Sequence, residues 1–79
     1  MTIYRIRFEG PAALAVGVAT ALADADGVDL TSSEQPSILD AGKVRLNVSA
    51  EGSEADIAAA VASIGASLPD GASIKVVDG

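Results

Sequence analysis

The sequence contains no cysteine, no histidine and no tryptophan, and it has one phenylalanine and one tyrosine in 79 residues. Without cysteine, neither disulfide bonds nor thiolate metal sites can form, which is consistent with a reducing compartment. Without histidine or cysteine, the usual general base near neutral pH and the usual metal ligands are missing, and no motif singles out a Ser or Thr nucleophile. We therefore predict a protein that is not an enzyme and that binds no metal or other cofactor.

Long apolar runs and leader-like segments are missing too. No stretch approaches the roughly 20 apolar residues of a membrane span, and the first expected strand starts within three residues of Met1, which leaves no room for a secretory leader. No glycine-rich phosphate loop is present, and the DADG run of residues 24–27 fits the end of a helix better than a calcium loop. We expect a cytoplasmic protein with no membrane partner.

Positive charge is scarce and unevenly placed. The formal net charge is −6, with 5 Lys and Arg against 11 Asp and Glu, which argues against bulk attraction to nucleic acid or anionic lipid. Four of the five cations lie in two short runs, YRIRF from Tyr4 to Phe8 and KVRLNV from Lys43 to Val48. In both runs polar and apolar residues alternate, which is typical of a strand with one buried face.

Length and composition predict a single domain over residues 1–79. A hydrophobic content of 49% is sufficient for one core, but a chain of this size buries only about 60% of its unfolded surface. With so few aromatic residues the core must be aliphatic, rich in alanine and thin. Self-association would therefore help the protein.

Hydrophobic periodicity predicts four strands and two helices in the order βαββαβ. The strands are expected at residues 3–8, 28–33, 43–48 and 74–77, with an irregular segment at 32–42. One helix should begin with Gly10 as its N-cap and Pro11 in its first turn, and should end before Asp26. The second should begin with a capping box of Ser53 and Asp56 and end before Pro69.

Two right-handed crossovers in this order interleave into a ferredoxin-like plait. This α+β fold has an antiparallel sheet in the strand order 4-1-3-2, with both helices on one face. The residues expected to face the helices are Tyr4, Ile6, Phe8, Val44, Leu46, Val48, Ile74 and Val76. The cations would then all point to the uncovered face: Arg5, Arg7, Lys43, Arg45 and Lys75. We therefore expect a basic sheet face on an acidic body.

Two explanations of this basic face remain open. The cations could simply keep an open sheet face polar while their aliphatic stems cover it. Alternatively, the face could dock an acidic protein or another copy, because clustered cations repel unless a partner, or Asp29 and Glu9 nearby, offsets them. Nucleic acid is disfavoured as a partner because both aromatic residues are assigned to the core. Ile38 and Leu39, two aliphatic residues in a polar loop, could anchor a partner or fold back over the core.

Two segments resemble ACT regulatory domains. EGPAAL, from Glu9 to Leu14, has the spacing of the Asp-x-Pro-Gly-x-Leu opening of that family. ALADADGVDL, residues 21–30, is similar to the family's Ala-Leu-Ala-Asp-Ala-Gly-Ile-Asn-Ile segment with one residue added. The resemblance covers residues 3–33 and implies an amino-acid site at an interface between paired domains. Its lining would be Glu9, Gly10, Pro11 and Ala12.

The sequence therefore favours a non-enzymatic interaction or adaptor module. It would self-associate as a homodimer or dock an acidic protein through the basic sheet face. The alternative is an ACT-like regulatory domain that binds an amino acid. An enzyme of unfamiliar type would require a cleft with strongly shifted carboxylates, which sequence alone does not reveal.

Overall fold

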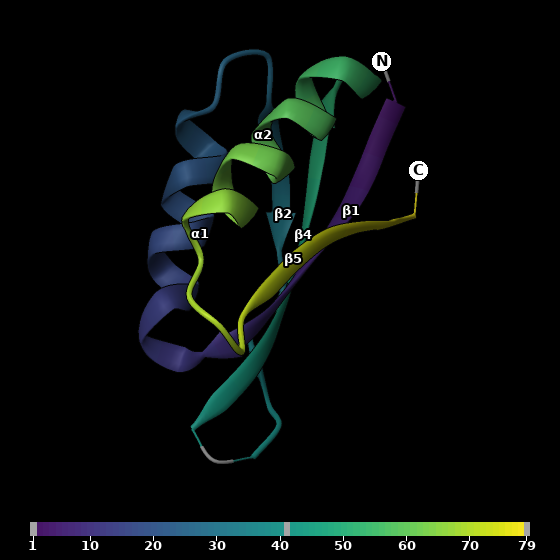
Figure 1. Cartoon of the computed structure of the whole chain (residues 1–79). Coiled ribbons are helices and arrows are strands. Elements are labelled where there is room, and N and C mark those ends of the chain that lie inside the picture. Colours follow the sequence, from purple (N-terminus) through teal and green to yellow (C-terminus); the bar gives the residue numbers. More distant parts are fainter. Residues whose placement is uncertain (1, 41, 79) are drawn as a thin grey trace.

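The computed structural model describes residues 2–40 and 42–78, which form five strands and two helices (Figure 1). In chain order the elements are β1 Thr2–Pro11, α1 Ala12–Asp24, β2 Asp29–Ser33, β3 Ser37–Ile38, β4 Lys43–Gly52, α2 Glu54–Ser67 and β5 Ser73–Asp78. The predicted α+β class with two helices is confirmed. Each predicted helix and strand has a counterpart whose bounds differ by a few residues.

All the strands belong to one antiparallel sheet. Their order is β2-β4-β1-β5, and β3 pairs with β4 outside this path. The central strands β1 and β4 are each 10 residues long and pair over their whole length, from Thr2 opposite Gly52 to Pro11 opposite Lys43. Both helices lie over the same face of the sheet, so the opposite face is open (Figure 1).

The strand β3 lies within the segment for which the sequence predicts irregular structure. It forms because β2 pairs with β4 only from Val48 to Glu51, which leaves the same edge of β4 free at Val44 and Arg45 to pair with Ile38 and Ser37. The turn is closed by backbone hydrogen bonds from Leu39 N to Lys43 O at 2.9 Å and from Lys43 N to Asp40 O at 2.8 Å. The prediction of four strands is therefore wrong by one short strand, which makes a hairpin extending beyond the helices (Figure 1).

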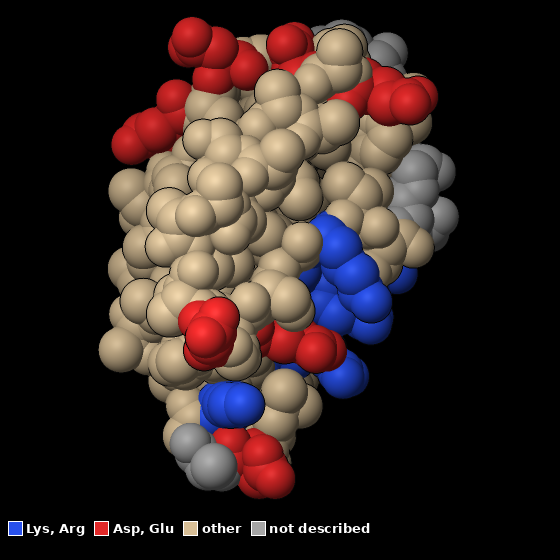
Figure 2. All heavy atoms as spheres, in the orientation of Figure 1, with Lys and Arg blue, Asp and Glu red and all other residues tan. Residues whose placement is uncertain are grey.

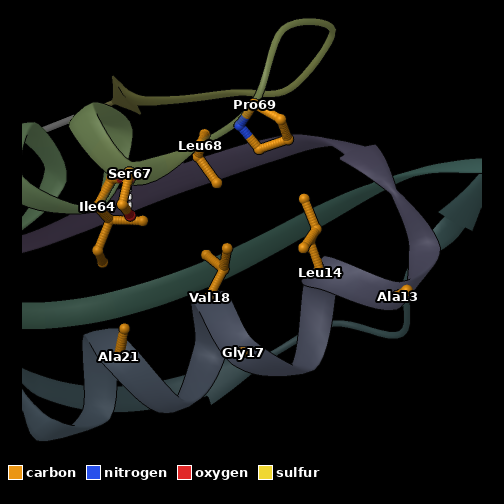
Figure 3. A pocket seen from close by; sticks show the side chains of 9 residues that line it. All are labelled: Ala13, Leu14, Gly17, Val18, Ala21, Ile64, Ser67, Leu68 and Pro69. Carbon is orange, nitrogen blue, oxygen red and sulfur yellow. Dashed lines mark hydrogen bonds between the residues drawn. The ribbon is translucent and has the colours of Figure 1, made fainter.

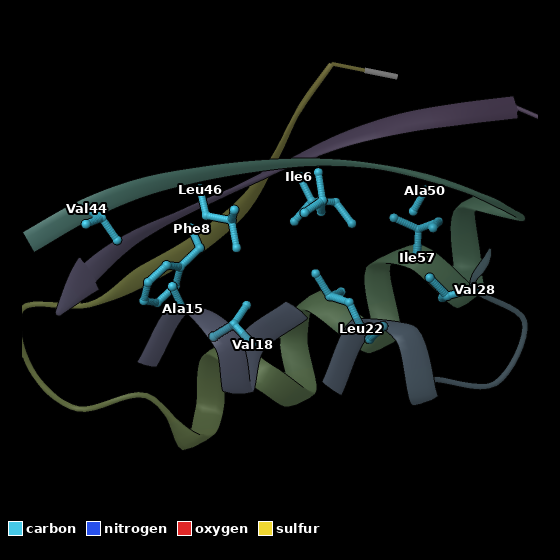
Figure 4. Close-up of a cluster of buried hydrophobic side chains, with 12 residues drawn as sticks. Ile6, Phe8, Ala15, Val18, Leu22, Val28, Val44, Leu46, Ala50 and Ile57 are labelled. Carbon is cyan, nitrogen blue, oxygen red and sulfur yellow. The ribbon is translucent and has the colours of Figure 1, made fainter. Parts of the chain in front are cut away.

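A layer of apolar side chains, all aliphatic except Phe8, lies between the sheet and the helices and forms the core (Figure 4). Its buried members are Ile6, Phe8, Ala15, Val18, Leu22, Val28, Val44, Leu46, Val48, Ala50, Ile57 and Ala60. Of the residues predicted to face the helices, Tyr4 and Ile74 pack against this core while only partly buried. Val76 lies opposite the buried Ile6, on the side of the sheet that the helices cover, as predicted, but it is 39% exposed.

The two helices begin differently. For α2 the predicted cap is confirmed, because Ser53 Oγ accepts a hydrogen bond from Asp56 N at 3.2 Å. The N-cap of α1 is Pro11, which offers no side-chain acceptor, and Gly10 is a buried residue of β1. The predicted N-cap role of Gly10 is therefore wrong. The hydrogen bond from Ala12 N to Gly42 O, at 2.9 Å, instead joins the start of α1 to the start of β4.

A close backbone contact fixes the end of the sheet where α1 stops and α2 begins. Gly27 follows α1 with a φ of 77°, a conformation that glycine adopts readily. A Cβ atom on Gly52, at the end of β4, would collide with the carbonyl oxygen of Gly27, and one on Gly27 would collide with the Asp56 carboxylate. Glycine at both positions therefore lets the turn after α1 lie directly on the end of β4.

We predict that Gly17→Ala and Gly52→Ala change stability in opposite directions. Gly17 lies within α1, and a Cβ atom there would have no neighbour within 4 Å. Alanine should therefore raise the free energy of unfolding by about 1 kcal/mol through helix propensity. Alanine at position 52 should lower it because of the collision with Gly27. Urea denaturation of both variants measures the two effects, and destabilisation by Gly17→Ala would contradict the open position of this residue.

Candidate functional site

The open face of the sheet carries the alternate residues of β1 and β4. Val44, Leu46, Val48 and Ala50 of β4 are buried beneath the helices, and the residues between them are half-buried. In β1, Ile6 and Phe8 are buried in the same way. Since successive side chains of a strand point to opposite faces, Arg5, Arg7 and Arg45 lie on the side that the helices leave open.

Strand register brings these cations close to one another. Arg7 lies opposite Asn47 of β4 on one side and opposite Lys75 of β5 on the other. Arg45 lies opposite Glu9, two residues further along β1. Directly opposed residues of an antiparallel pair have Cβ atoms about 4.5–5.5 Å apart. We refer to Arg5, Arg7, Arg45 and Lys75 as the cationic patch.

Three further residues predicted to bind a partner lie outside the cationic patch. Lys43 is at the end of the β1–β4 ladder, opposite Pro11, and its Nζ would be 3.8 Å from a Cβ atom on Gly71, in the turn before β5. Ile38 lies opposite the buried Val44, so it belongs to the other side of the sheet from the cations. Ile38 and Leu39 are 84% and 40% exposed, so neither is tucked into the core.

Two carboxylates partly neutralise the cationic patch. Arg45 Nε donates a hydrogen bond to Glu9 Oε2 at 2.6 Å, and both side chains are more than a third exposed. Arg5 Nη2 lies 3.9 Å from Glu34 Oε1, a looser and more exposed pair. The sequence pattern suggests Glu9 for this role, but not Glu34. The expectation that Asp29 offsets the cations is wrong, because Asp29 lies opposite Glu51.

Arg7 and Lys75, at the centre of the cationic patch, are not neutralised by a carboxylate among the described side chains. Arg7 Nε donates a hydrogen bond to Asn47 Oδ1 at 3.2 Å, which orients the guanidinium without neutralising it. Among the side chains that the structure describes, no carboxylate forms a salt bridge with Arg7 or Lys75. Asn47 completes the KVRLNV alternation, so its place on this face follows from the sequence. Its bond to Arg7 does not, because it depends on the register between strands.

The cations lower the pKa of Glu9 below its ordinary value. The largest cause is the hydrogen bond from Arg45, which stabilises the ionised carboxylate, and partial loss of hydration opposes it. The positive charges of Arg45, Arg7 and Lys75 lower the pKa of Glu9 further. Glu9 therefore lies within the electrostatic reach of three of the four patch cations and stays ionised at neutral pH.

The four residues implied by the ACT resemblance do not converge on one cavity. Glu9 points to the open face, where it binds Arg45. Gly10 faces the other way, and a Cβ atom on it would lie 2.8 Å from Ala72 Cβ, so the segment just before β5 already occupies this space. Pro11 is half-buried at the end of β1, and Ala12 is exposed in the first turn of α1.

A shallow groove of about 230 Å³ runs between the two helices (Figure 3). Leu14 and Val18 of α1 face Ile64 and Leu68 across it (Figure 3). The only hydroxyl in its lining belongs to Ser67, which donates its hydrogen bond to the carbonyl oxygen of Ile64 at 2.9 Å. The lining has no ionisable side chain, so this groove lacks the groups for acid-base chemistry.

Negative charge gathers at one end of the molecule, beyond Arg5, which lies opposite Ser49. We call this the acidic end, and it comprises Asp24, Asp26, Asp29, Glu51, Glu54 and Asp56. These residues come together because α1 ends, β2 begins, β4 ends and α2 begins there. Figure 2 shows acidic side chains at this end and cations beside β5, with few charges on the helices between them.

Comparison with protein-family models, with curated proteins and with solved structures finds no match to this chain. Within the described residues, no helix is both long and apolar enough to cross a membrane. Nor do three acidic side chains of residues 2–40 and 42–77 lie where they could hold one metal ion. A functional conclusion therefore depends on the geometry of the surface.

We predict that Arg45→Gln raises the pKa of Glu9. The lowered folded-state pKa means that ionised Glu9 adds to stability above its unfolded-state pKa, and that this contribution is lost as pH falls through the folded-state value. Removing the Arg45 hydrogen bond should move the titration midpoint of the Glu9 carboxyl carbon, measured by NMR, to higher pH. Arg5→Gln is the control, because Arg5 does not contact Glu9. Equal midpoints in the wild type and Arg45→Gln would contradict the contact.

Proposed function

We propose that the protein is a non-enzymatic interaction module that docks an acidic protein surface through the cationic patch on its open sheet face. The single observation that carries this proposal is the pair of neighbouring cations, Arg7 and Lys75, at the centre of the patch. Like charges that lie directly opposite each other destabilise a sheet, and no acidic side chain in the described part of the chain forms a salt bridge with either one. A carboxylate from a partner would offset both charges.

The surroundings of this pair support a docking surface over a merely solvated face. Asn47 holds the Arg7 guanidinium, which lowers the entropy lost when a partner binds. Glu9 and Glu34 already engage Arg45 and Arg5, so the remaining positive potential is concentrated at one place. A protein with a formal net charge of −6 gains specificity from such a local patch because its other surfaces repel acidic partners.

The fold supports an open docking face of the kind found in ferredoxin-like plaits. The support is the sheet path β5-β1-β4-β2, which is compatible with the order of that plait if the two-residue β3 is left out. We propose that the chain is a variant of that plait in which the β3–β4 hairpin is an extension. Such a sheet leaves one face free for a partner while the helices shield the core.

We predict that the protein binds a fluorescein-labelled oligoglutamate peptide through Arg7 and Lys75. Each charge pair at 4 Å in water contributes about 1 kcal/mol, so Arg7→Gln with Lys75→Gln should weaken binding roughly thirtyfold. Raising the salt concentration should weaken wild-type binding as well, because the Debye length shortens from about 30 Å at 0.01 M to about 8 Å at 0.15 M. Fluorescence anisotropy measures both effects.

The matched control carries Thr20→Glu with Ala62→Glu on the exposed surfaces of the helices. It changes the net charge by the same amount as the double glutamine variant and should retain most of the binding. Equal losses in the two variants would mean that only net charge matters and would refute the docking site. Tighter binding to a single-stranded oligonucleotide of equal charge would indicate a nucleic-acid partner instead.

An ACT-like amino-acid-binding domain is the second candidate. The supporting observation is that Glu9, Gly10, Pro11 and Ala12 lie at the junction of β1 and α1, the position that the resemblance implies. We predict for this candidate that one of the common amino acids raises the thermal unfolding temperature. The exposed Ala12→Trp should abolish that rise. Gly10 is unsuitable for the test, because a larger residue there would collide with Ala72 in the absence of any ligand. The absence of a rise with any amino acid would exclude this candidate.

A further inference from the structure

The strand β5 forms one edge of the sheet. It stands at the end of the strand order and pairs with β1 along one side, and no strand in the described part of the chain pairs with its other side. The main-chain N–H and C=O groups along this side are therefore free to bind a further strand. The regular part of the edge runs from Ser73 to Val76, because the register with β1 shifts after Val76.

Apolar and cationic side chains alternate along this edge. Val76 lies opposite Ile6, which is buried beneath the helices. Ile74 lies opposite Phe8, which is buried in the same way. Lys75, between these two apolar residues, therefore points to the open side of the sheet. Because Ile74 is only half-buried and Val76 is 39% exposed, the edge leaves apolar surface uncovered at the rim of the core.

We propose that the acidic partner is an extended segment in which carboxylate and apolar side chains alternate, and that it adds to β5 as a further strand of the sheet. This inference rests on the proposed function, because it uses Lys75 of the same cationic patch and states how the partner is held. Hydrogen bonds between the main chains hold the segment against β5. One row of its side chains places a carboxylate beside Lys75 on the open side, and the other row covers Val76.

The charge of Lys75 selects an acidic segment. A lysine on an edge strand hinders edge-to-edge association unless the incoming strand supplies the opposite charge. Directly opposed residues of an antiparallel pair have Cβ atoms about 4.5–5.5 Å apart, so a glutamate that faces Lys75 can reach its ammonium group. The same glutamate offsets the repulsion between Lys75 and Arg7, which lie opposite each other. Arg7 is one strand farther from the added segment, about 10 Å away, and contributes less to binding.

The opposite edge of the sheet does not offer these features. The strand β2 begins with Asp29, which lies opposite Glu51, so an acidic segment would meet negative charge there. Apart from Leu30, the other residues of β2 carry hydroxyl groups and present no apolar row. Of these two edges, β5 is therefore the one at which both side-chain rows of the proposed segment meet a complementary surface.

The test compares fluorescein-labelled hexapeptides of equal charge, which match the 6 residues of β5 in length. The first alternates glutamate and valine, and the second has the same residues in two uniform blocks. The third is the alternating peptide with every residue N-methylated, which removes its main-chain donors. Fluorescence anisotropy should show the tightest binding for the first peptide and binding at least about tenfold weaker for the third, because the main-chain hydrogen bonds are lost.

Amide hydrogen exchange shows where the alternating peptide binds. An added strand protects the edge to which it pairs. The peptide should therefore slow the exchange of amides between Ser73 and Val76 and leave the amides of β2 unchanged. Protection of β2 in place of β5 would overturn the inference.

Variants of the protein test the two side-chain rows separately. Lys75→Gln should weaken binding of the alternating peptide about fivefold, and Arg7→Gln should weaken it less. Val76→Thr keeps the shape of the side chain but loses apolar contact, so it should weaken binding about threefold. Val16→Thr is the matched control, because Val16 is 76% exposed on α1, and it should leave binding unchanged. Circular dichroism checks that each variant is folded.

The outcomes separate this inference from the proposed function. Equal binding of the alternating peptide and its N-methylated form would overturn the inference, and so would equal losses in Val76→Thr and Val16→Thr. If N-methylation has no effect while oligoglutamate binds through Arg7 and Lys75, the proposed function stands and the inference falls. If neither oligoglutamate nor the alternating peptide binds, both fall.

Discussion

The pairing of β1 with β4 is the constraint on which the rest of the structure depends. The two strands run side by side for 10 residues, and the register between them determines which side chains of β1 lie opposite which side chains of β4. Because side chains alternate, a slip of one residue would turn Ile6 and Phe8 to solvent and bring Arg7 beneath the helices. Burial of the aliphatic set therefore holds the register, and the register in turn places the polar set on the open face. The core and the polar open face are two consequences of one alternation.

Most of the few cations of the chain lie together on the open face of the sheet. The chain has only 5 cations, and β1, β4 and β5 bring four of them into one patch. Glu9 lies within this patch and binds Arg45, so part of the positive charge is satisfied internally. Arg7 and Lys75 are left as neighbours of like sign, and Asp29 opposite Glu51 is a second pair of like sign, this one negative. A sheet stabilised by burial of its other face can retain such unfavourable pairs, and the proposed docking site lies at one of them.

The helical layer has a different role. Its inner side fills the thin aliphatic core, and its outer side consists largely of alanine and other small residues. The groove between α1 and α2 has an apolar lining without ionisable groups, whereas the residues of the cationic patch lie on the sheet. The close contact between Gly27 and Gly52 joins this layer to the end of β4 and positions the turn that leads into Asp29.

The sequence by itself determined the α+β class, the two helices, most of the buried residues and the cap at Ser53, because these depend on local periodicity and on neighbours in the chain. It also separated the cations of β1 and β4 from the core, since alternation is a local property. Only the tertiary structure decided which charges are paired. Glu34 approaches Arg5, and Asp29 faces Glu51 rather than a cation, because register between strands distant in sequence sets these contacts. The local sequence pattern also did not predict three other features: the strand β3, the burial of Gly10 against Ala72 and the exposure of Val76. Each of these features depends on contacts, or on a lack of contacts, between segments that are distant in the sequence.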